Sequence, residues 1–352
     1  LLTTLPVILL SFIDLYTWYA DWINLVGWGH WVPTASLRVS PLFDGPIISA
    51  AYFNFLIPLG IMRGVTSQSR INRILISVWV VICVFLIFLT SSRGGWLGLF
   101  ATCGSLALFL GFEYRERIII WLKKPSHRVF SVGGIVIVVA IVVVANIYFF
   151  AWQTHSTSSA GTGLKIEARS GIWQIGLDAF LKHPLLGNGP FTFGTIYISA
   201  SSTPPSNVMP HAHNQILNTA VEAGLIGLVG LGFMLILICL MIYRCWKRTA
   251  GVERLTLFGI ISSLIGFAVQ SQSDTLLFWP SAAIIFVALL ALLAKEDLQD
   301  NNHIFRRWKT ISLPILFSFT IIALGYGLYS YQAAIRGVEA SREGNWNKAS
   351  TS

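Results

Sequence analysis

The sequence predicts an all-α fold, a polytopic bundle of membrane-spanning helices, and three observations lead to that class. Of the 352 residues, 55% are hydrophobic and only 11% are charged, whereas about a quarter of the residues in a soluble domain are charged. Uncharged stretches about 20 residues long, such as the one from Ser131 to Phe150, recur along the chain. A helix needs about 20 apolar residues to cross the ~30 Å hydrocarbon layer of a bilayer, so these stretches are long enough to span it.

Hydropathy divides the chain into about nine predicted spans. The sequence begins at Leu1 inside an apolar run and has no initiating Met. We therefore expect it to be a piece of a longer protein with earlier spans. The predicted spans are 1–16, 47–62, 74–90, 95–112, 130–150, 215–243, 255–272, 276–294 and 310–331.

Basic residues gather in four short loops that alternate with the remaining connections. Lys and Arg are enriched in the cytoplasmic loops of membrane proteins, so these loops are predicted to face the cytoplasm. The same bias explains the net charge of +9. Since the sequence has no motif for RNA or DNA binding, we expect no nucleic-acid partner. The basic loops are 63–73, 113–129, 244–254 and 295–309.

The longest loop, residues 151–214, falls on the opposite side of the membrane. Loops of this length are uncommon unless they carry function. Apolar side chains recur at helical spacing from Glu167 to His183, which predicts an amphipathic helix on the membrane surface. The prolines and glycines of HPLLGNGP then end that helix. In a bacterial inner membrane this side would be periplasmic.

Two histidines and an asparagine, in the stretch PHAHN, stand directly before the span at 215–243. His213, Ala220, Gly224 and Gly227 fall close to one helical face, and small residues on such a face allow a neighbouring helix to approach. We therefore expect His213 to be held at the membrane surface above a tight helix contact. A metal site is weakly indicated, because no Cys or carboxylate stands near the two histidines in the sequence.

Two arginines on the same side form a second group of candidate residues. Arg93 lies in a two-span turn, SSRGG, and Arg169 lies at the start of the predicted surface helix. Guanidinium groups bind phosphate with paired donors, so both are candidates for holding an anion. Gln270, Gln272 and Asp274 cluster at another outer turn and are candidates for lining an acceptor cleft.

Three blocks of sequence resemble the O-antigen ligase and Wzy-type polymerase superfamily of bacterial membrane glycosyltransferases, over residues 40 to 295. The first is SSRGGWLGLF, and the second is RSGIWQIGLDAFLKHPLLGNGPFTF, which begins at Arg169. The third is His-Asn, nine residues and Gly-x-x-Gly, from His213 to Gly227. The second and third blocks, in this order and on the outer side, are the more specific.

The resemblance implies a GT-C-like helical bundle that takes a glycan from undecaprenyl diphosphate on the periplasmic face. The acceptor would be a hydroxyl of a lipid, a glycan or a protein, as in lipopolysaccharide biosynthesis. Carried over by position, His213 would be the catalytic base and Arg93 and Arg169 would hold the diphosphate. His211 and Asn214 are assigned to substrate binding, and no cofactor or metal is expected. Histidine suits proton transfer because its unperturbed pKa lies near neutrality.

The domain prediction is a bundle of residues 1–332, which includes the periplasmic loop, followed by an extracytoplasmic segment at 333–352. Residues Ala334 to Ser350 resemble the first helix of a tetratricopeptide repeat, and an ordinary amphipathic helix is the alternative. Two other functions stay open. A membrane transporter of a small solute or inorganic carbon is the first, although no internal repeat is visible. A scaffold that binds a lipid-linked sugar without catalysis is the second.

Overall fold

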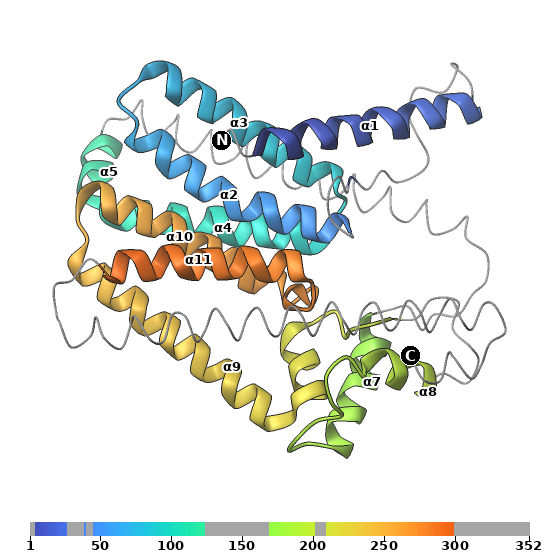
Figure 1. The fold of residues 1–352 in the computed structure, drawn as a ribbon. Helices are drawn as coiled ribbons and strands as arrows, with labels where there is room; N and C mark the ends of the chain where they lie inside the picture. Colours follow the sequence, from blue (N-terminus) through green and yellow to red (C-terminus); the bar gives the residue numbers. More distant parts are fainter. Residues whose placement is uncertain (1–3, 27–38, 40–44, 124–168, 201–208, 299–352) are drawn as a thin grey trace. The chain divides into compact units, whose positions relative to one another are not determined.

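The computed structural model describes residues 4–26, 39, 45–123, 169–200 and 209–298, and every regular element in these ranges is a helix (Figure 1). Residue contacts divide the chain into two compact units, Leu1–Leu293 and Ala294–Ser352. The predicted all-α class is confirmed. The elements are α1 (Leu5–Val26), α2 (Pro46–Thr66), α3 (Arg70–Leu89), α4 (Arg93–Glu113), α5 (Arg115–Leu122), α7 (Arg169–Lys182), α8 (Phe193–Ala200), α9 (Gln215–Arg248), α10 (Gly251–Gln270), the 3₁₀ helix η3 (Leu276–Phe278) and α11 (Pro280–Leu298).

Five of the described helices are long and apolar enough to cross a membrane: α2, α3, α4, α9 and α10. They correspond to five of the predicted spans. Helix α1 starts at Leu5 but continues to Val26, beyond the predicted end of the first span, and it is not among the five. The apolar part of α11, Pro280–Lys295, is shorter. The predicted spans 130–150 and 310–331 and the repeat-like segment 333–352 lie outside the described residues.

Three of the spanning helices begin at polar residues that cap them. The side-chain oxygens of Ser69, Ser92 and Asn214 each accept a hydrogen bond from the backbone N–H three residues further on. Such caps satisfy N–H groups that have no partner inside the helix. They also fix where α3, α4 and α9 start, and therefore the positions of Arg93 and His213 next to two of these caps.

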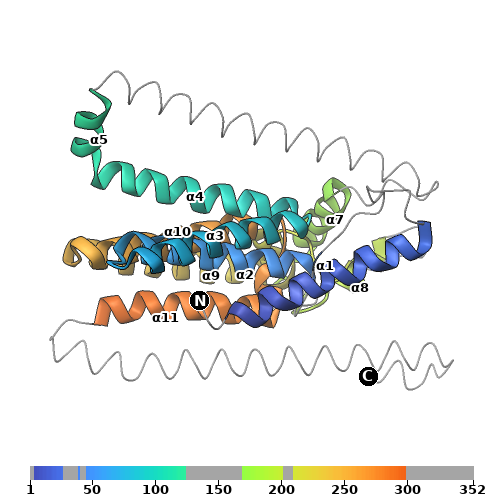
Figure 2. The ribbon, with the colours of Figure 1, turned by 90° about the horizontal axis from the view of Figure 1, so that it is seen from above.

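Helices α2, α4 and α10 pack on one another and run side by side (Figure 2). Nδ2 of Asn54 in α2 donates to the Gly95 carbonyl of α4 at 2.8 Å and to Oε1 of Gln270 in α10 at 3.0 Å. Nε2 of Gln270 donates to the Ile47 carbonyl at 2.9 Å. Polar groups in a membrane interior must find partners within the protein, and this network links all three helices. Gln270 is fully buried there, so its predicted place in an open cleft is wrong.

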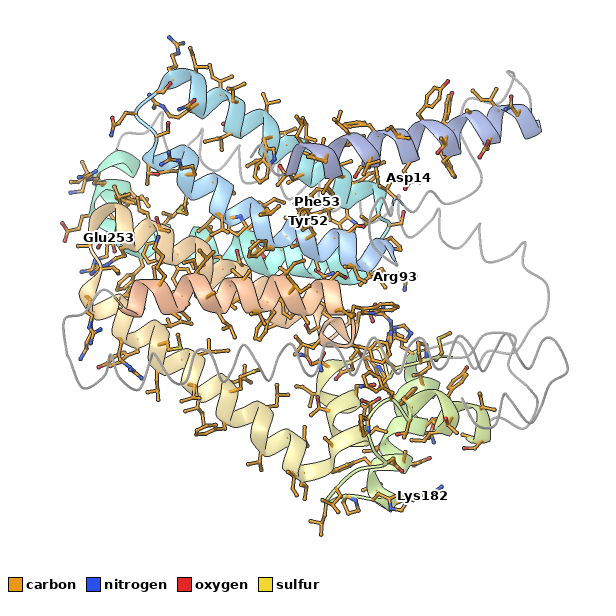
Figure 3. All side chains as sticks on the ribbon, viewed as in Figure 1. Asp14, Tyr52, Phe53, Arg93, Lys182 and Glu253 are labelled. Carbon is orange, nitrogen blue, oxygen red and sulfur yellow. The ribbon has the colours of Figure 1, made fainter. Side chains whose placement is uncertain are left out.

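Basic side chains gather at one end of the bundle. The C-terminal turns of α2 and α9 contain Arg63, Lys247 and Arg248. Arg254, in the first turns of α10, forms a 3.4 Å ion pair with Glu113 at the C-terminus of α4. Arg93 begins α4 and so lies at the opposite end of that helix from this ion pair (Figure 3). The helix directions therefore keep the candidate site away from the basic loops, as the alternation of loops predicts.

Candidate functional site

The histidine segment ends in a strained residue. His213 has a φ of 51°, in the left-handed region, a conformation that costs a non-glycine residue about 1–3 kcal/mol. Asn214 follows it, and its Oδ1 accepts the Leu217 N–H at 3.0 Å. The cap and the contacts described below hold His213 in this conformation.

The turn after α10 docks against the start of α9 through three hydrogen bonds. The Gln215 N–H donates to the Ser271 carbonyl at 2.9 Å. Nδ2 of Asn214 donates to the Gln272 carbonyl at 3.1 Å. The Leu277 N–H donates to Oε1 of Gln215 at 3.1 Å. These bonds place the residues of the turn, including Asp274, beside the histidine segment.

His213 and Asp274 form a hydrogen-bonded pair. Nδ1 of His213 lies 3.3 Å from Oδ1 of Asp274, and the two side chains are 21% and 2% exposed. The Thr275 N–H donates to the same oxygen at 2.8 Å. Burial opposes ionisation of Asp274, but the hydrogen bond from His213, the neighbouring histidines and the Thr275 N–H outweigh it and lower the pKa of the carboxyl. Asp274 is therefore a carboxylate at neutral pH.

His211 is a buried, neutral neighbour of this pair. Burial lowers its pKa to about 4, although the Asp274 carboxylate partly opposes that shift. Its side chain is 3% exposed, and its Nδ1 lies 3.7 Å from Asp274. That distance would suit an ion pair, but the low pKa leaves the ring uncharged at neutral pH. The ring centroid of His211 lies 4.4 Å from that of His213 and 5.1 Å from that of Phe278.

The hydrogen bonds assign the protons on both rings. Nδ1 of His211 accepts the His213 backbone N–H at 3.3 Å, so the neutral ring carries its proton on Nε2. The Asp274 carboxylate can only accept, so Nδ1 of His213 carries the proton between them. Nε2 of His213 then has a free lone pair. This arrangement can take a proton from a bound hydroxyl and stabilise the imidazolium that forms.

The same three side chains have the composition of a possible metal site. One ligand atom from each of His211, His213 and Asp274 lies within 4.8 Å of the others, and Zn²⁺ accepts such imidazole and carboxylate ligands. The sequence indicates a metal site only weakly, because no carboxylate stands near the two histidines along the chain. The fold brings the carboxylate of Asp274 to them. The hydrogen bonds above already involve Nδ1 of both histidines and Oδ1 of Asp274, and they describe a histidine oriented by an aspartate.

Arg93 lies close to the turn that contains Asp274. It is the first residue of α4, directly after the Ser92 cap. At the next residue, Gly94, a Cβ atom would come 3.0 Å from Cβ of Ser273. Gly94 is therefore needed for α4 to approach this turn. The Arg93 side chain is exposed, so the fold brings an arginine to the end of the bundle that contains the His–Asp pair.

Arg169 is the first residue of α7, and its side chain is also exposed. Helix α7 packs on α9. At Gly176 a Cβ atom would come 3.1 Å from the side chain of Leu217, the third residue of α9. Ile172, which lies closer to Arg169, belongs to the same buried cluster as Ala212. These contacts bring α7 to the histidine segment, and the convergence of both arginines on His213 stays a prediction.

Gly224 interrupts α9, which bends there (Figure 1). Its φ of 62° and ψ of −156° leave the surrounding backbone groups without helical partners. The turn Pro184–Gly189 supplies these partners. The Asn188 N–H donates to the Val221 carbonyl at 2.8 Å, and the Gly189 N–H donates to the Glu222 carbonyl at 3.0 Å. The Leu225 and Ile226 N–H groups donate to Pro184 and Leu185 at 2.8 and 3.3 Å.

The prediction that a neighbouring helix packs on Gly224 is wrong. The small residues of this stretch were expected to admit another helix, but Gly224 packs against the backbone of Leu185 and Gly187 in an irregular turn. The strained φ and the close backbone contact both require glycine. The His-Pro-Leu-x-Gly-x-Gly block and the His-Asn block are therefore parts of one structure.

Residues 78–232 match the family model described as O-antigen ligase. This match supports the resemblance of this part of the chain to the O-antigen ligase and polymerase superfamily. The family match supports a glycosyltransferase of the ligase or polymerase type, and the apolar helices support a location in a membrane. A comparison with curated proteins gives no match.

The O-antigen ligase match includes all five residues predicted for the site and ends before Asp274. The roles of those residues are not tested by the match. His211 is buried, and both polar groups of the Asn214 side chain have structural partners, so their assignment to substrate binding stays a prediction. The sequence predicts Asp274 only as a residue of the acceptor cleft, and it does not predict the pairing with His213. A carboxylate between two apolar spans was the available signal.

Proposed function

We propose that this O-antigen ligase superfamily member transfers a glycan from undecaprenyl diphosphate to an acceptor hydroxyl, with His213 as the general base. The observation that carries the proposal is the 3.3 Å contact between His213 and Asp274. It orients a partly exposed imidazole and leaves its Nε2 available. The acceptor is a hydroxyl of a lipid such as the lipid A core, of a glycan or of a protein.

The reaction needs one proton transfer and one substitution. Nε2 of His213 takes the proton of the acceptor hydroxyl as its oxygen attacks the anomeric carbon. The new glycosidic bond forms while the bond to the lipid diphosphate breaks, and the diphosphate leaves with its negative charge. Asp274 stabilises the imidazolium that results. Attack opposite the leaving group inverts the anomeric centre, and NMR of the product configuration tests this; a retained configuration would contradict it.

Arg93 and Arg169 are proposed to bind the diphosphate. Both are exposed and begin helices packed near the His–Asp pair. Charge grows on the leaving diphosphate, and fixed guanidinium groups stabilise it with paired hydrogen bonds. The proposed reaction uses no metal or cofactor, because the two arginines supply the positive charge. Solvent screening limits the contribution of exposed arginines, so their geometry matters more than their number.

The active face is proposed to be periplasmic and the membrane to be the bacterial inner membrane. The basic C-terminal turns of α2 and α9 and the Arg254–Glu113 pair lie at the end opposite to Arg93. Because cytoplasmic loops are enriched in Lys and Arg, the end that contains Arg93 and His213 faces the other side.

A transfer assay with purified protein, an undecaprenyl-diphosphate-linked glycan and an acceptor tests the proposal. We expect His213→Ala to lower kcat by about 10²–10⁴-fold, the range for loss of a general base. Arg169→Ala and Arg93→Ala should weaken donor binding by about tenfold or more, since a charge-assisted pair is lost. The matched controls are His183→Ala and Arg73→Ala, which remove exposed side chains of the same types.

The outcomes separate the competing functions. Normal turnover in both His213→Ala and Arg169→Ala would contradict the site assignment. Donor binding without any transfer in the native chain, across lipid, glycan and protein acceptors, would favour a scaffold. Uptake of a solute by proteoliposomes, abolished by the same substitutions, would favour a transporter.

A further inference from the structure

Glu222 is a carboxylate in the interior of α9 that the proposed reaction does not use. Its Oε1 atom is buried and has no hydrogen-bond partner among the described residues. The carboxylate otherwise forms hydrogen bonds with the side chain of Asn218 and with the backbone of Phe191 and Phe193. A partly buried carboxyl group with these partners links parts of the chain that are distant in sequence.

The bond to Asn218 leads to the histidine segment. Asn218 is buried, and its Oδ1 accepts the N–H of Ala212 at 3.0 Å. Ala212 lies between His211 and His213. The Asn218 amide can offer its oxygen to Ala212 only when its NH₂ group faces the other way, toward Glu222. A carboxyl group has an oxygen that accepts hydrogen bonds in either protonation state, so Glu222 favours this orientation of the amide.

The bond to Phe191 leads toward His211 by a second route. Phe191 has a φ of 60°, a strained value for a non-glycine residue. Its ring centroid lies 5.6 Å from that of Phe278, and Phe278 lies 5.1 Å from His211. Glu222 is therefore linked to the histidine segment by two routes: through Asn218 to the Ala212 N–H, and through Phe191 to the ring of Phe278, which lies beside His211.

We propose that Glu222 is a positioning residue that fixes the His211–His213 segment through Asn218 and through the backbone at Phe191 and Phe193. This inference rests on the proposed function of His213. The role requires a hydrogen-bond acceptor at a defined distance from the helix and does not require a negative charge. Glutamine supplies an acceptor oxygen at the same distance, whereas aspartate keeps the charge but is one methylene shorter.

The test compares Glu222→Gln, Glu222→Asp and Glu222→Leu, with Glu253→Leu as a control that removes an exposed carboxylate in the first turn of α10. We expect Glu222→Gln and Glu253→Leu to keep kcat within about threefold of the native protein. Glu222→Asp and Glu222→Leu should lower kcat by about a hundredfold, because a displacement of about 1 Å can cost that much. The KM for the lipid-linked donor should change little, since the arginines are untouched.

A second measurement does not depend on transfer activity. Diethyl pyrocarbonate modifies accessible histidines, and mass spectrometry of the peptide that contains His211 and His213 locates the label. In the native protein His213 should react and the buried His211 should be protected. Glu222→Asp and Glu222→Leu should expose His211 to the reagent, whereas Glu222→Gln and Glu253→Leu should keep it protected.

The two measurements separate the two hypotheses. If no glycan transfer is found, the proposed function fails, but the protection of His211 still decides the role of Glu222. If His211 stays protected in Glu222→Asp and Glu222→Leu, the positioning role is overturned. If Glu222→Gln is as defective as Glu222→Leu in both measurements, the acceptor geometry proposed for this residue is also overturned.

Discussion

Asp274 accepts a hydrogen bond from His213 across 61 residues of sequence, at 3.3 Å. The aspartate belongs to the turn that follows α10, and the histidine precedes α9. Three hydrogen bonds from Asn214, Gln215 and Leu277 hold the turn against the start of α9. The pair therefore depends on how two helix ends dock.

Replacing Asp274 should impair transfer more than donor binding. In Asp274→Asn the amide can offer its NH₂ group to His213, which favours the tautomer with the proton on Nε2 and removes the free lone pair. We expect kcat to fall by about a hundredfold, within the range for general-base catalysis. Steady-state kinetics of the transfer assay check this, with Asp178→Asn, at an exposed carboxylate of α7, as the matched control. An unchanged kcat would show that Asp274 does not orient the base.

Acidification should destabilise the protein through His211. The folded-state pKa of about 4 lies below the ordinary value of 6.5, so the unfolded chain binds a proton first as pH falls. The free energy of unfolding should therefore decrease from pH 6.5 toward pH 4, by at most about 1.4 kcal/mol per pH unit. Asp274 faces His211, and its lowered pKa acts in the same direction at still lower pH. Above pH 6.5 His211 contributes no pH dependence.

Thermal melting of detergent-solubilised protein between pH 7 and pH 4.5 measures this effect. His211→Asn keeps an acceptor near the His213 N–H and removes the titrating ring, so its melting temperature should fall less steeply with acidification. His183→Asn, which changes an exposed histidine, should keep the native slope. Parallel curves for the native protein and His211→Asn would contradict the prediction.

Gly224→Ala should destabilise the fold. The residue has a φ of 62°, and an added Cβ would meet the backbone of Leu185 and Gly187. We expect a loss of about 2 kcal/mol or more, because both the backbone strain and the clash oppose alanine. Melting temperature measures the loss. Gly232→Ala is the control, since Gly232 lies in the same helix with open space around its Cβ position. Equal stability of the two variants would contradict a role for the kink.

Removing metal should leave transfer intact. Nδ1 of His211, Nδ1 of His213 and Oδ1 of Asp274 already take part in hydrogen bonds within the protein, and the proposed reaction obtains its positive charge from arginine. Treatment with EDTA followed by buffer exchange should therefore keep the transfer rate unchanged. A loss of activity that one divalent cation restores would instead make these three side chains a metal centre.

Local sequence was enough to predict much of the fold. The five spanning helices follow from runs of apolar residues. The tight turns near Ser91 and near Ser273 follow from the short polar breaks between those runs. Hydropathy depends on neighbours in the sequence, so it can be read without coordinates. The family resemblance likewise depends on short motifs, and it located His213, Arg93 and Arg169 as candidates.

Only the tertiary structure decided how these residues meet. The pairing of His213 with Asp274, the burial of His211 and Gln270, and the turn that supplies hydrogen bonds at Gly224 all join segments distant along the chain. The contacts of Glu222 could not be predicted from local sequence either, because they lie on two different segments. A residue's partners across such distances depend on helix docking and on which backbone groups lack helical bonds. Neither quantity is contained in the pattern of any single stretch of sequence.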